Sequence, residues 1–201
     1  MKALFIDRDG VINKDPGGWT KYSYVTEPKD LHFLPGSLDA LRLLRDSGIG
    51  VIVVSNQAGV SKGYFTEGRL NEINDRMLKE ISSHGGNVIA VYYCIHKDED
   101  RCSCRKPGTG LFEMAARKYD IDFNDTYIIG DAKGDIEAGR RLGMKTIFVL
   151  SGKTPEGEMK KWKDKPDYVF RDLLGAVTWL LDKEKRREDR ARRRVGDRRQ
   201  K

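Results

Sequence analysis

The sequence predicts an α/β fold, an open and mainly parallel sheet with helices packed on both faces. Three observations support this prediction: short apolar runs rich in β-branched and aromatic residues, amphipathic stretches between them, and capping or glycine residues at the boundaries. Runs that are apolar throughout are typical of parallel strands buried on both faces. Strands that alternate with helices favour a single sheet joined by right-handed crossovers.

Five apolar runs are predicted as strands, and five amphipathic stretches as helices. The strands cover residues 2–6, 50–55, 88–94, 126–130 and 145–150. The helices cover residues 38–46, 66–83, 110–119, 135–142 and 173–181. Ser37 can cap the first helix and Thr66 the second, and Gly48 and Gly85 follow the last turns of these two helices. No linker or repeat divides the chain, so residues 1–182 are expected to form one domain.

The net charge of the chain is concentrated in its last residues. The 201 residues include 38 Lys/Arg and 31 Asp/Glu, which gives a net charge of +7. Residues 183–201, the basic tail, hold 11 of these basic and 4 of these acidic residues, which leaves 27 of each sign in the first 182 residues. The mixed charges and the lack of aromatic residues in the tail favour a solvated helical extension. An arm that binds a polyanion or a membrane surface weakly is the alternative.

The expected location is the cytoplasm, because the sequence shows no export or membrane signal. No apolar run approaches the roughly 18 to 20 residues of a membrane span. The apolar part of the opening segment, MKALFIDRDG, is too short for a signal peptide. In a reducing compartment, clustered cysteines are more often metal ligands than disulfides. We also expect the protein to be a monomer without a membrane span.

Four of the predicted strands are followed by residues that can take part in chemistry. Asp7 and Asp9 follow the first strand, and residues 55–57 follow the second with a hydroxyl and two amides. The basic pair 105–106 follows the third, and two more carboxylates lie within 131–135 after the fourth. Ligands bind beyond the carboxyl ends of such strands, and clustered carboxylates with room for water suit Mg²⁺. Beside a lysine and a serine, this metal fits a phosphoryl group, which an Asp can attack as a nucleophile.

These motifs resemble those of the haloacid dehalogenase (HAD) superfamily of phosphatases. The first is DRDGV, the second Ser55, the third Lys106 and the fourth GDAKGD, and the resemblance spans residues 2–150. Within the superfamily, the D-glycero-D-manno-heptose 1,7-bisphosphate 7-phosphatases look most similar, on the segments FIDRDGVIN, VVSNQAGVSKGYFTE and CRKPGTGLF. The resemblance implies a Rossmann-like domain. No stretch of roughly 50 residues or more is left between the motifs for a large cap domain, so we expect an open site.

The resemblance implies a role for each carboxylate. Asp7 would attack phosphorus and bind Mg²⁺, whereas Asp9 would protonate the leaving oxygen, activate water in the second step and bind the metal through its carbonyl. Asp131 would complete the protein ligands of Mg²⁺, and Asp135 would support them without a direct bond to the metal. The positions that match the substrate-binding loops of the family are Asp15, Pro16, Gly17, Gly18, Ser55, Asn56, Gln57, Ala58, Arg105 and Lys106.

The sequence departs from the family pattern in two places. Relatives often have a lysine directly after the carboxylate of the fourth motif, where this chain has Ala132, with Lys133 one position later. A loop that often reads Gly-Tyr reads Gly18-Trp19 here. Both positions concern contact with the substrate, so the sugar and its anomer stay open.

All three cysteines of the chain lie close together, beside one of its three histidines. Cys94, His96, Cys102 and Cys104 form a C-x-H and a C-x-C pair, and a similar arrangement occurs in the family. Four nitrogen and sulfur ligands without a spare position are typical of structural zinc. We expect zinc to fold the loop 98–101 and to fix the basic pair that follows it. Reduced cysteines that cluster by chance are the alternative.

The predicted function is that of a Mg²⁺-dependent phosphatase, which hydrolyses a sugar phosphate ester through an aspartyl-phosphate. The resemblance favours the 7-phosphate of D-glycero-D-manno-heptose 1,7-bisphosphate as the substrate. Histidinol phosphate or another small phosphate ester is the alternative within this class. A zinc-containing protein that binds or processes nucleic acid is less favoured, because aromatic residues are not interleaved with basic ones in the body. Nucleic acid is therefore expected to bind weakly, if at all, and through the basic tail.

Overall fold

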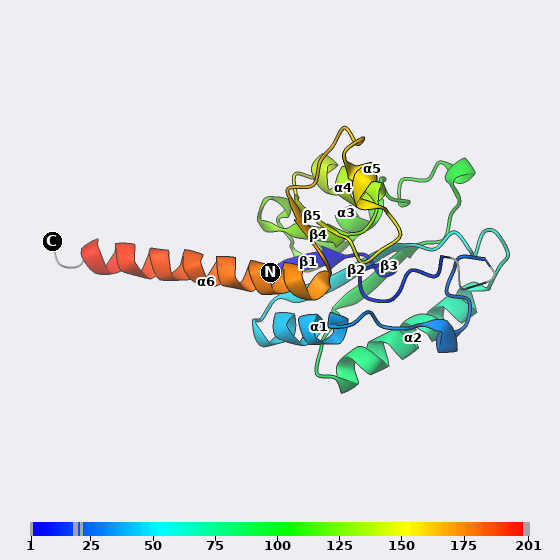
Figure 1. Ribbon diagram of the computed structural model, residues 1–201, viewed down its shortest axis with the longest axis horizontal. Coiled ribbons are helices and arrows are strands. Elements are labelled where there is room, and N and C mark those ends of the chain that lie inside the picture. Colours follow the sequence, from blue (N-terminus) through cyan, green and yellow to red (C-terminus); the bar gives the residue numbers. More distant parts are fainter. Residues whose placement is uncertain (1, 18–19, 21, 199–201) are drawn as a thin grey trace.

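A six-stranded sheet forms the centre of the computed structural model, which describes residues 2–17, 20 and 22–198 (Figure 1). The strands follow the order β3-β2-β1-β4-β5-β6, and every pair of neighbours is parallel. The predicted open parallel sheet is therefore confirmed. The strands are β1 (Ala3–Ile6), β2 (Gly50–Asn56), β3 (Ala90–Cys94), β4 (Tyr127–Gly130), β5 (Lys145–Val149) and β6 (Tyr168–Phe170).

Helices cover both faces of the sheet, as predicted. The α-helices are α1 (Ser37–Asp46), α2 (Glu67–Ser83), α3 (Gly110–Tyr119), α4 (Lys133–Arg141), α5 (Glu156–Met159) and α6 (Leu173–Arg198). Helices α1, α2 and α6 lie on one face, and α3, α4 and α5 lie on the other (Figure 1). Within the described residues, three short 3-10 helices occur in the connections, η1 (Pro28–Asp30), η2 (Asp98–Asp100) and η3 (Phe123–Asp125).

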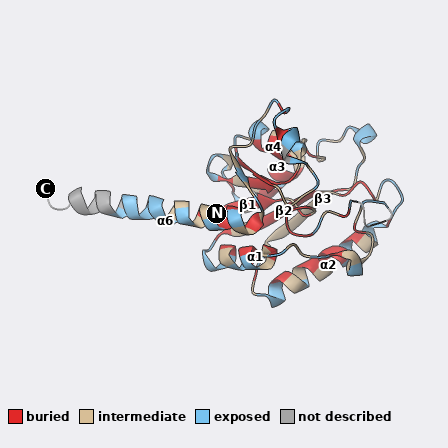
Figure 2. Ribbon diagram, in the orientation of Figure 1, coloured by how far each residue is buried: buried red, intermediate tan, exposed pale blue. Residues whose placement is uncertain are grey.

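The two apolar layers are built from alternate residues of the same strands. In β1, Leu4 and Ile6 belong to the core that faces α1 and α6, whereas Phe5 belongs to the core that faces α3. The ring of Phe5 lies 5.1 Å from the ring of Phe112 in α3, edge to face. Every residue of β1 is therefore buried (Figure 2), and this explains why the strand has no polar alternation in its sequence.

The sequence does not predict β6 or α5, because each is very short and carries no periodic pattern. Helix α4 begins at Lys133, before its predicted start at residue 135. Helix α6 continues past residue 181 to Arg198, because the added residues are mostly Lys, Arg and Glu, which are good helix formers. Although α6 is long, no helix of the described part of the chain is both long and apolar enough to cross a membrane.

No separate cap domain lies between β1 and α1 in the part of the chain that the structure describes. That connection contains only η1 and two isolated bridges, Asp9–Asn13 and Asn13–Phe33. The bridges draw the chain back across the end of β1, so Asp9 and Asn13 become neighbours. The loop thus shapes the edge of the sheet without covering it as a domain would.

Asp167 fixes the start of β6 to the start of β5. Its carboxylate accepts hydrogen bonds from the amide and the hydroxyl of Thr146 at 2.8 and 3.1 Å, and lies 3.0 Å from the guanidinium of Arg140. Burial alone would raise the pKa of Asp167, but these partners outweigh it and hold the pKa below its ordinary value. A carboxylate of this kind adds stability above its unfolded pKa, and the gain is lost as the pH falls through the folded pKa.

Asp167→Asn is expected to lower the free energy of unfolding at neutral pH by about 1 to 3 kcal/mol, because it loses charge-assisted hydrogen bonds. The difference from wild type should shrink as the pH falls below about 4. Urea unfolding at a series of pH values measures both effects, and Asp164→Asn is the matched control. A difference of the same size at roughly pH 7 and pH 3 would show that the charge of Asp167 does not contribute.

Candidate active site

A cavity of about 480 Å³ lies beyond the carboxyl ends of the strands. Four segments predicted from the sequence meet there, each from the end of a different strand. The predicted site residues that line the cavity are Asp7, Asp9, Asp15, Pro16, Ser55, Asn56, Arg105, Lys106, Asp131 and Asp135. Of the other predicted residues, Gly17, Gln57 and Ala58 do not line the cavity, and Gly18 lies outside the described residues.

Three carboxylates meet in this cavity. One oxygen from each of Asp7, Asp131 and Asp135 lies within 4.8 Å of the others. Burial raises the pKa of Asp7 to about 6, although Lys106 opposes this effect. Burial and then the neighbouring Asp7 raise the pKa of Asp131 well above its ordinary range. Three carboxylates and one lysine leave an excess of negative charge, and a hard divalent cation with oxygen ligands fits this donor set.

Lys106 is the cation among these carboxylates. Its ammonium lies 2.9 Å from Asp7 and 2.6 Å from Asp135, and it donates to the carbonyl of Val54 at 2.7 Å. Its backbone exchanges two hydrogen bonds with the side-chain amide of Asn56, at 3.0 and 3.1 Å. Burial alone would lower the pKa of Lys106, but the two carboxylates outweigh it and raise that pKa. Lys106 is therefore charged and fixed beside the Asp7 carboxylate.

Asp9 lies in a cradle of hydrogen-bond donors. The guanidinium of Arg8 lies 3.0 Å from its carboxylate, and the side-chain amides of Asn13 and Gln57 donate to it at 2.8 and 2.7 Å. Burial alone would raise the pKa of Asp9, but Arg8 and then Asn13 outweigh it and lower that pKa. In this arrangement Asp9 is ionised and suited to accept a proton. To donate a proton, Asp9 first has to be protonated, and the Arg8 guanidinium disfavours that form.

Seven residues that line the cavity are not among the predicted site residues. Ala132 and Gly134 belong to the fourth motif, and the other five are Tyr22, Ser23, Tyr24, Lys62 and Lys153. The ring of Tyr22 stacks on that of Tyr64 at 4.3 Å, and the ammonium of Lys62 lies 5.7 Å from the centre of the Tyr24 ring. The two tyrosines of the segment YSY, soon after the first motif, are a sequence signal that could have predicted this side of the cavity. Lys153 comes from the loop after β5, and no local pattern marks it.

Of the two places where the sequence departs from the family pattern, the structure describes only the one at Ala132 and Lys133. Ala132 lines the cavity, whereas the ammonium of Lys133 lies 3.2 Å from Glu137, one turn along α4. Lys133 is not among the lining residues, so it does not bring a positive charge to the cavity in place of Ala132. Gly18 and Trp19 lie outside the described residues.

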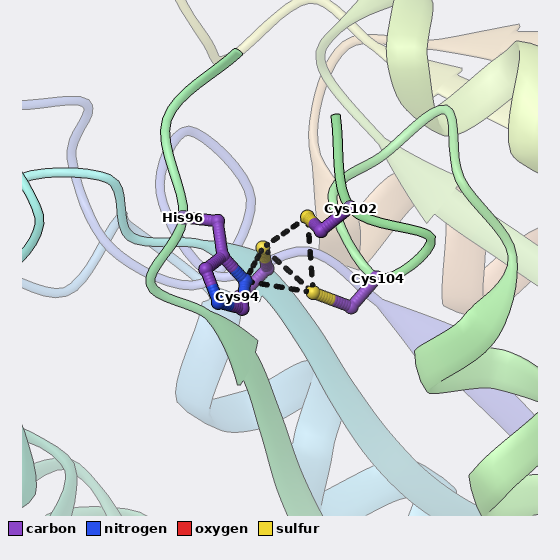
Figure 3. Close-up of side chains that lie close together, drawn as sticks. All are labelled: Cys94, His96, Cys102 and Cys104. Atoms are coloured by element: carbon purple, nitrogen blue, oxygen red, sulfur yellow. Dashed lines mark hydrogen bonds between the residues drawn. The ribbon is translucent and has the colours of Figure 1, made fainter. Parts of the chain in front are cut away.

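The side chains of Cys94, His96, Cys102 and Cys104 point toward one another (Figure 3). The sulfur of Cys104 lies 3.0 Å from that of Cys94, 3.2 Å from that of Cys102 and 3.2 Å from Nδ1 of His96. Zinc–sulfur bonds of about 2.3 Å place tetrahedral ligands about 3.7 Å apart, so these atoms need to separate only slightly around an ion. Burial and contact with Cys104 raise the pKa of Cys94, so a thiolate there requires a cation. The donor set fits zinc.

The loop of this cluster contacts one of the two basic residues directly. Arg105 follows Cys104 in the chain, and its guanidinium donates to the carboxylate of Asp98, in η2, at 2.5 Å. Lys106 is held instead by the end of β2, through Asn56. The cluster therefore supports the position of Arg105 more than that of Lys106.

Similarity to known proteins agrees with this geometry. A HAD-hydrolase-like family model matches residues 103–176. The chain is 43% identical over 143 residues to the probable D-glycero-D-manno-heptose-1,7-bisphosphate 7-phosphatase of Thermoplasma volcanium, which covers 71% of this chain and 94% of the relative. It is 35% identical over 181 residues to the D-glycero-beta-D-manno-heptose-1,7-bisphosphate 7-phosphatase of Pseudomonas putida, which covers 90% and 100%.

A solved structure is similar over nearly the same span. The D,D-heptose 1,7-bisphosphate phosphatase from B. bronchiseptica, complexed with magnesium and phosphate, superposes with a TM-score of 0.82. It is 32% identical in sequence, and the match covers 91% of this chain and 99% of that structure. The similarity therefore extends to the arrangement of the whole sheet and its helices.

Proposed function

Because the chain belongs to the HAD-like family of heptose-1,7-bisphosphate 7-phosphatases, we propose that it hydrolyses the 7-phosphate of D-glycero-D-manno-heptose 1,7-bisphosphate. Membership of this family makes the protein a phosphoric monoester hydrolase. The observation that carries the choice of substrate is the similarity over the full length of the Pseudomonas putida relative. The cavity supports it, because carboxylates, a buried lysine and the Ser55 hydroxyl meet where a phosphoryl group would bind.

Mg²⁺ is the metal of this proposal. Asp7, Asp131 and the backbone carbonyl of Asp9 would hold it, and the support is the excess negative charge of the buried carboxylates. Asp135 would keep the metal site in shape, because its carboxylate also pairs with Lys106 and accepts the amide of Ala132 at 3.1 Å. When bound, Mg²⁺ would offset the charge of the phosphate oxygens.

The first step transfers the phosphoryl group to the enzyme. A carboxylate oxygen of Asp7 attacks phosphorus, and the bond from phosphorus to the sugar oxygen breaks as the new bond forms. Asp9, protonated at the start of this step, gives its proton to the departing oxygen, which leaves as a free hydroxyl. Lys106, which lies 2.9 Å from Asp7, offsets negative charge that collects on the phosphoryl oxygens. The product on the enzyme is an aspartyl-phosphate.

The second step returns the enzyme to its starting state. Asp9 takes a proton from water, the water oxygen attacks phosphorus, and the bond between phosphorus and Asp7 breaks to release inorganic phosphate. The cradle around Asp9 favours its ionised form, which is the form that this step requires. Asp9 therefore acts as an acid in the first step and as a base in the second, and the proton taken from water restores its starting form.

The cysteine cluster would bind zinc as a structural metal. The support for this role is the close approach of the four donor atoms and the absence of disulfides among the three described cysteines. Because thiols of this kind have to stay reduced, we place the protein in the cytoplasm.

The test is a phosphatase assay on both anomers of the heptose bisphosphate, histidinol phosphate and p-nitrophenyl phosphate, with Mg²⁺ or with EDTA. We expect kcat/KM to be at least about tenfold higher for one heptose anomer than for the other esters. EDTA should stop turnover and added Mg²⁺ should restore it. Equal use of histidinol phosphate would contradict the proposed substrate, and turnover that persists in EDTA would contradict the proposed metal.

A further inference from the structure

The last helix leaves the body of the protein. Helix α6 begins packed on the sheet, and its second half projects away from the other elements (Figure 1). The side chains from Lys185 to Arg190 and that of Arg192 are exposed (Figure 2). This projecting part belongs to the basic tail, residues 183–201, which accounts for the whole net charge of the chain. The part of the tail whose exposure is described, residues 183–190 and 192, is therefore a charged and mostly exposed helix.

The start of the basic tail is fixed to the body. The ammonium of Lys183 lies 4.8 to 5.4 Å from the centres of three aromatic rings, those of Tyr127, Tyr168 and Trp179. Glu184 pairs with Lys2 at 2.6 Å, and Arg187 pairs with Asp125 at 3.2 Å. The tail is therefore the continuation of a helix that is anchored to the body, and its charges follow the axis of that helix.

The tail leaves the body at the edge opposite to the active-site cavity. Lys2 directly precedes β1 and Asp125 lies just before β4, so their ion pairs with the tail mark the amino ends of the strands. The cavity lies beyond the carboxyl ends of the same strands. A molecule bound along the tail therefore leaves the cavity open.

The composition of the tail indicates the chemistry of its partner. Ala191 and Val195 are its only aliphatic residues, so it lacks an apolar face for a partner helix or a membrane interface. Eight of its 11 basic residues are arginines, whose guanidinium groups bind phosphates with two parallel hydrogen bonds. Arg186 and Arg190 are four positions apart, so they share one face of the helix. A row of arginines on a straight helix matches the repeated phosphates of a nucleic acid.

We propose that the basic tail binds the phosphodiester backbone of nucleic acid, as a second function separate from the phosphatase site. The body holds equal numbers of basic and acidic residues, so the attraction comes from the tail. By helical spacing, Glu188 lies on the opposite side from Arg186 and Arg190, whereas Asp189 borders them and offsets one of the 11 positive charges of the tail. Because the helix is anchored and already formed, binding orders little additional chain. The interaction is electrostatic and does not depend on base sequence.

The test measures binding of the full chain to a fluorescent DNA duplex of about 20 base pairs at roughly 50 and 200 mM salt. The tail variant carries Arg186→Glu, Arg190→Glu and Arg192→Glu. The matched control carries Arg117→Glu, Lys160→Glu and Lys163→Glu, which are exposed on the body and change the net charge equally. Wild-type affinity should fall steeply with salt, and the tail variant should bind at least about tenfold more weakly at low salt. The control should stay within about threefold of wild type, and both variants should keep wild-type kcat/KM.

Further measurements keep this result independent of folding and of the phosphatase proposal. Truncation after Arg187 keeps the contacts of Lys183 and Arg187 and should also abolish binding to the duplex. Equal loss in the tail variant and the control would overturn the proposal in favour of net charge alone. Binding to phosphatidylserine vesicles but not to the duplex would identify a membrane surface as the partner and overturn it too. The proposal would also be overturned if the truncated protein still bound the duplex, or if the wild type did not bind it at low salt. Neither outcome depends on the result of the phosphatase assay.

Discussion

Asp7→Asn is expected to reduce kcat by at least about a thousandfold while the protein stays folded. An amide does not form the bond to phosphorus that the Asp7 carboxylate forms. The change is mild for the structure, because asparagine has the same shape and still accepts the hydrogen bond from the amide of Arg8, which is 2.7 Å long. It also removes a buried negative charge whose pKa burial raises to about 6. The loss should therefore appear in the chemical step.

Steady-state kinetics, Mg²⁺ affinity and urea unfolding together check this expectation. Asp39→Asn replaces an exposed carboxylate of α1 and should keep the wild-type kcat. Mass spectrometry of the purified Asp7→Asn protein establishes that the asparagine has not reverted to aspartate by deamidation. Residual activity within about tenfold of wild type would remove Asp7 from the role of nucleophile.

Cys102→Ser is expected to release zinc and to raise KM by about tenfold or more, with a smaller effect on kcat. Without the metal, the loop between the ligands loses its cross-link, and Arg105 loses the position that Asp98 gives it. Lys106 is held separately, through the side-chain amide of Asn56. Substrate binding should therefore suffer more than the phosphoryl step.

Metal analysis of protein purified without a chelator should find about one zinc per wild-type chain and none in the Cys102→Ser variant. Ser103→Ala changes the neighbouring residue, which is not part of the cluster, and should keep both the zinc and the wild-type KM. Added Mg²⁺ should not rescue Cys102→Ser, because a hard cation does not replace zinc among thiolates. A zinc-free wild type with full activity, or turnover supported by zinc alone, would overturn the structural role of the cluster.

Most of the sheet can be predicted because its central strands are apolar on both faces. Strand β6 is different, because its three residues lie at the edge of the sheet and Val169 is 43% exposed. A strand that is half open to solvent leaves no continuous apolar run in the sequence. The apolar pattern also does not predict how far α6 extends, because the helix continues where it no longer packs on apolar residues.

Some residues of the candidate site can likewise be predicted from the sequence, and others cannot. The carboxylates, the serine and the lysine could be placed because each follows a buried strand, and parallel strands end at one edge. Arg8 could not be placed, since a charged residue is expected at the surface, yet its guanidinium is fully buried against Asp9. Tyr22 and Lys153 line the cavity from loops whose paths depend on distant packing, and no local pattern records such paths.

The side-chain amide of Asn56 pairs with the backbone of Lys106 as a neighbouring strand pairs with a residue inside a sheet. It satisfies both backbone hydrogen-bonding groups of Lys106 from 50 positions away in the chain. Lys106 can therefore keep its place when the loop before it gains, loses or exchanges residues. Changes within residues 97–101 would therefore act on Arg105, through its contact with Asp98, and leave Lys106 beside Asp7, so substrate binding and the phosphoryl step can change separately.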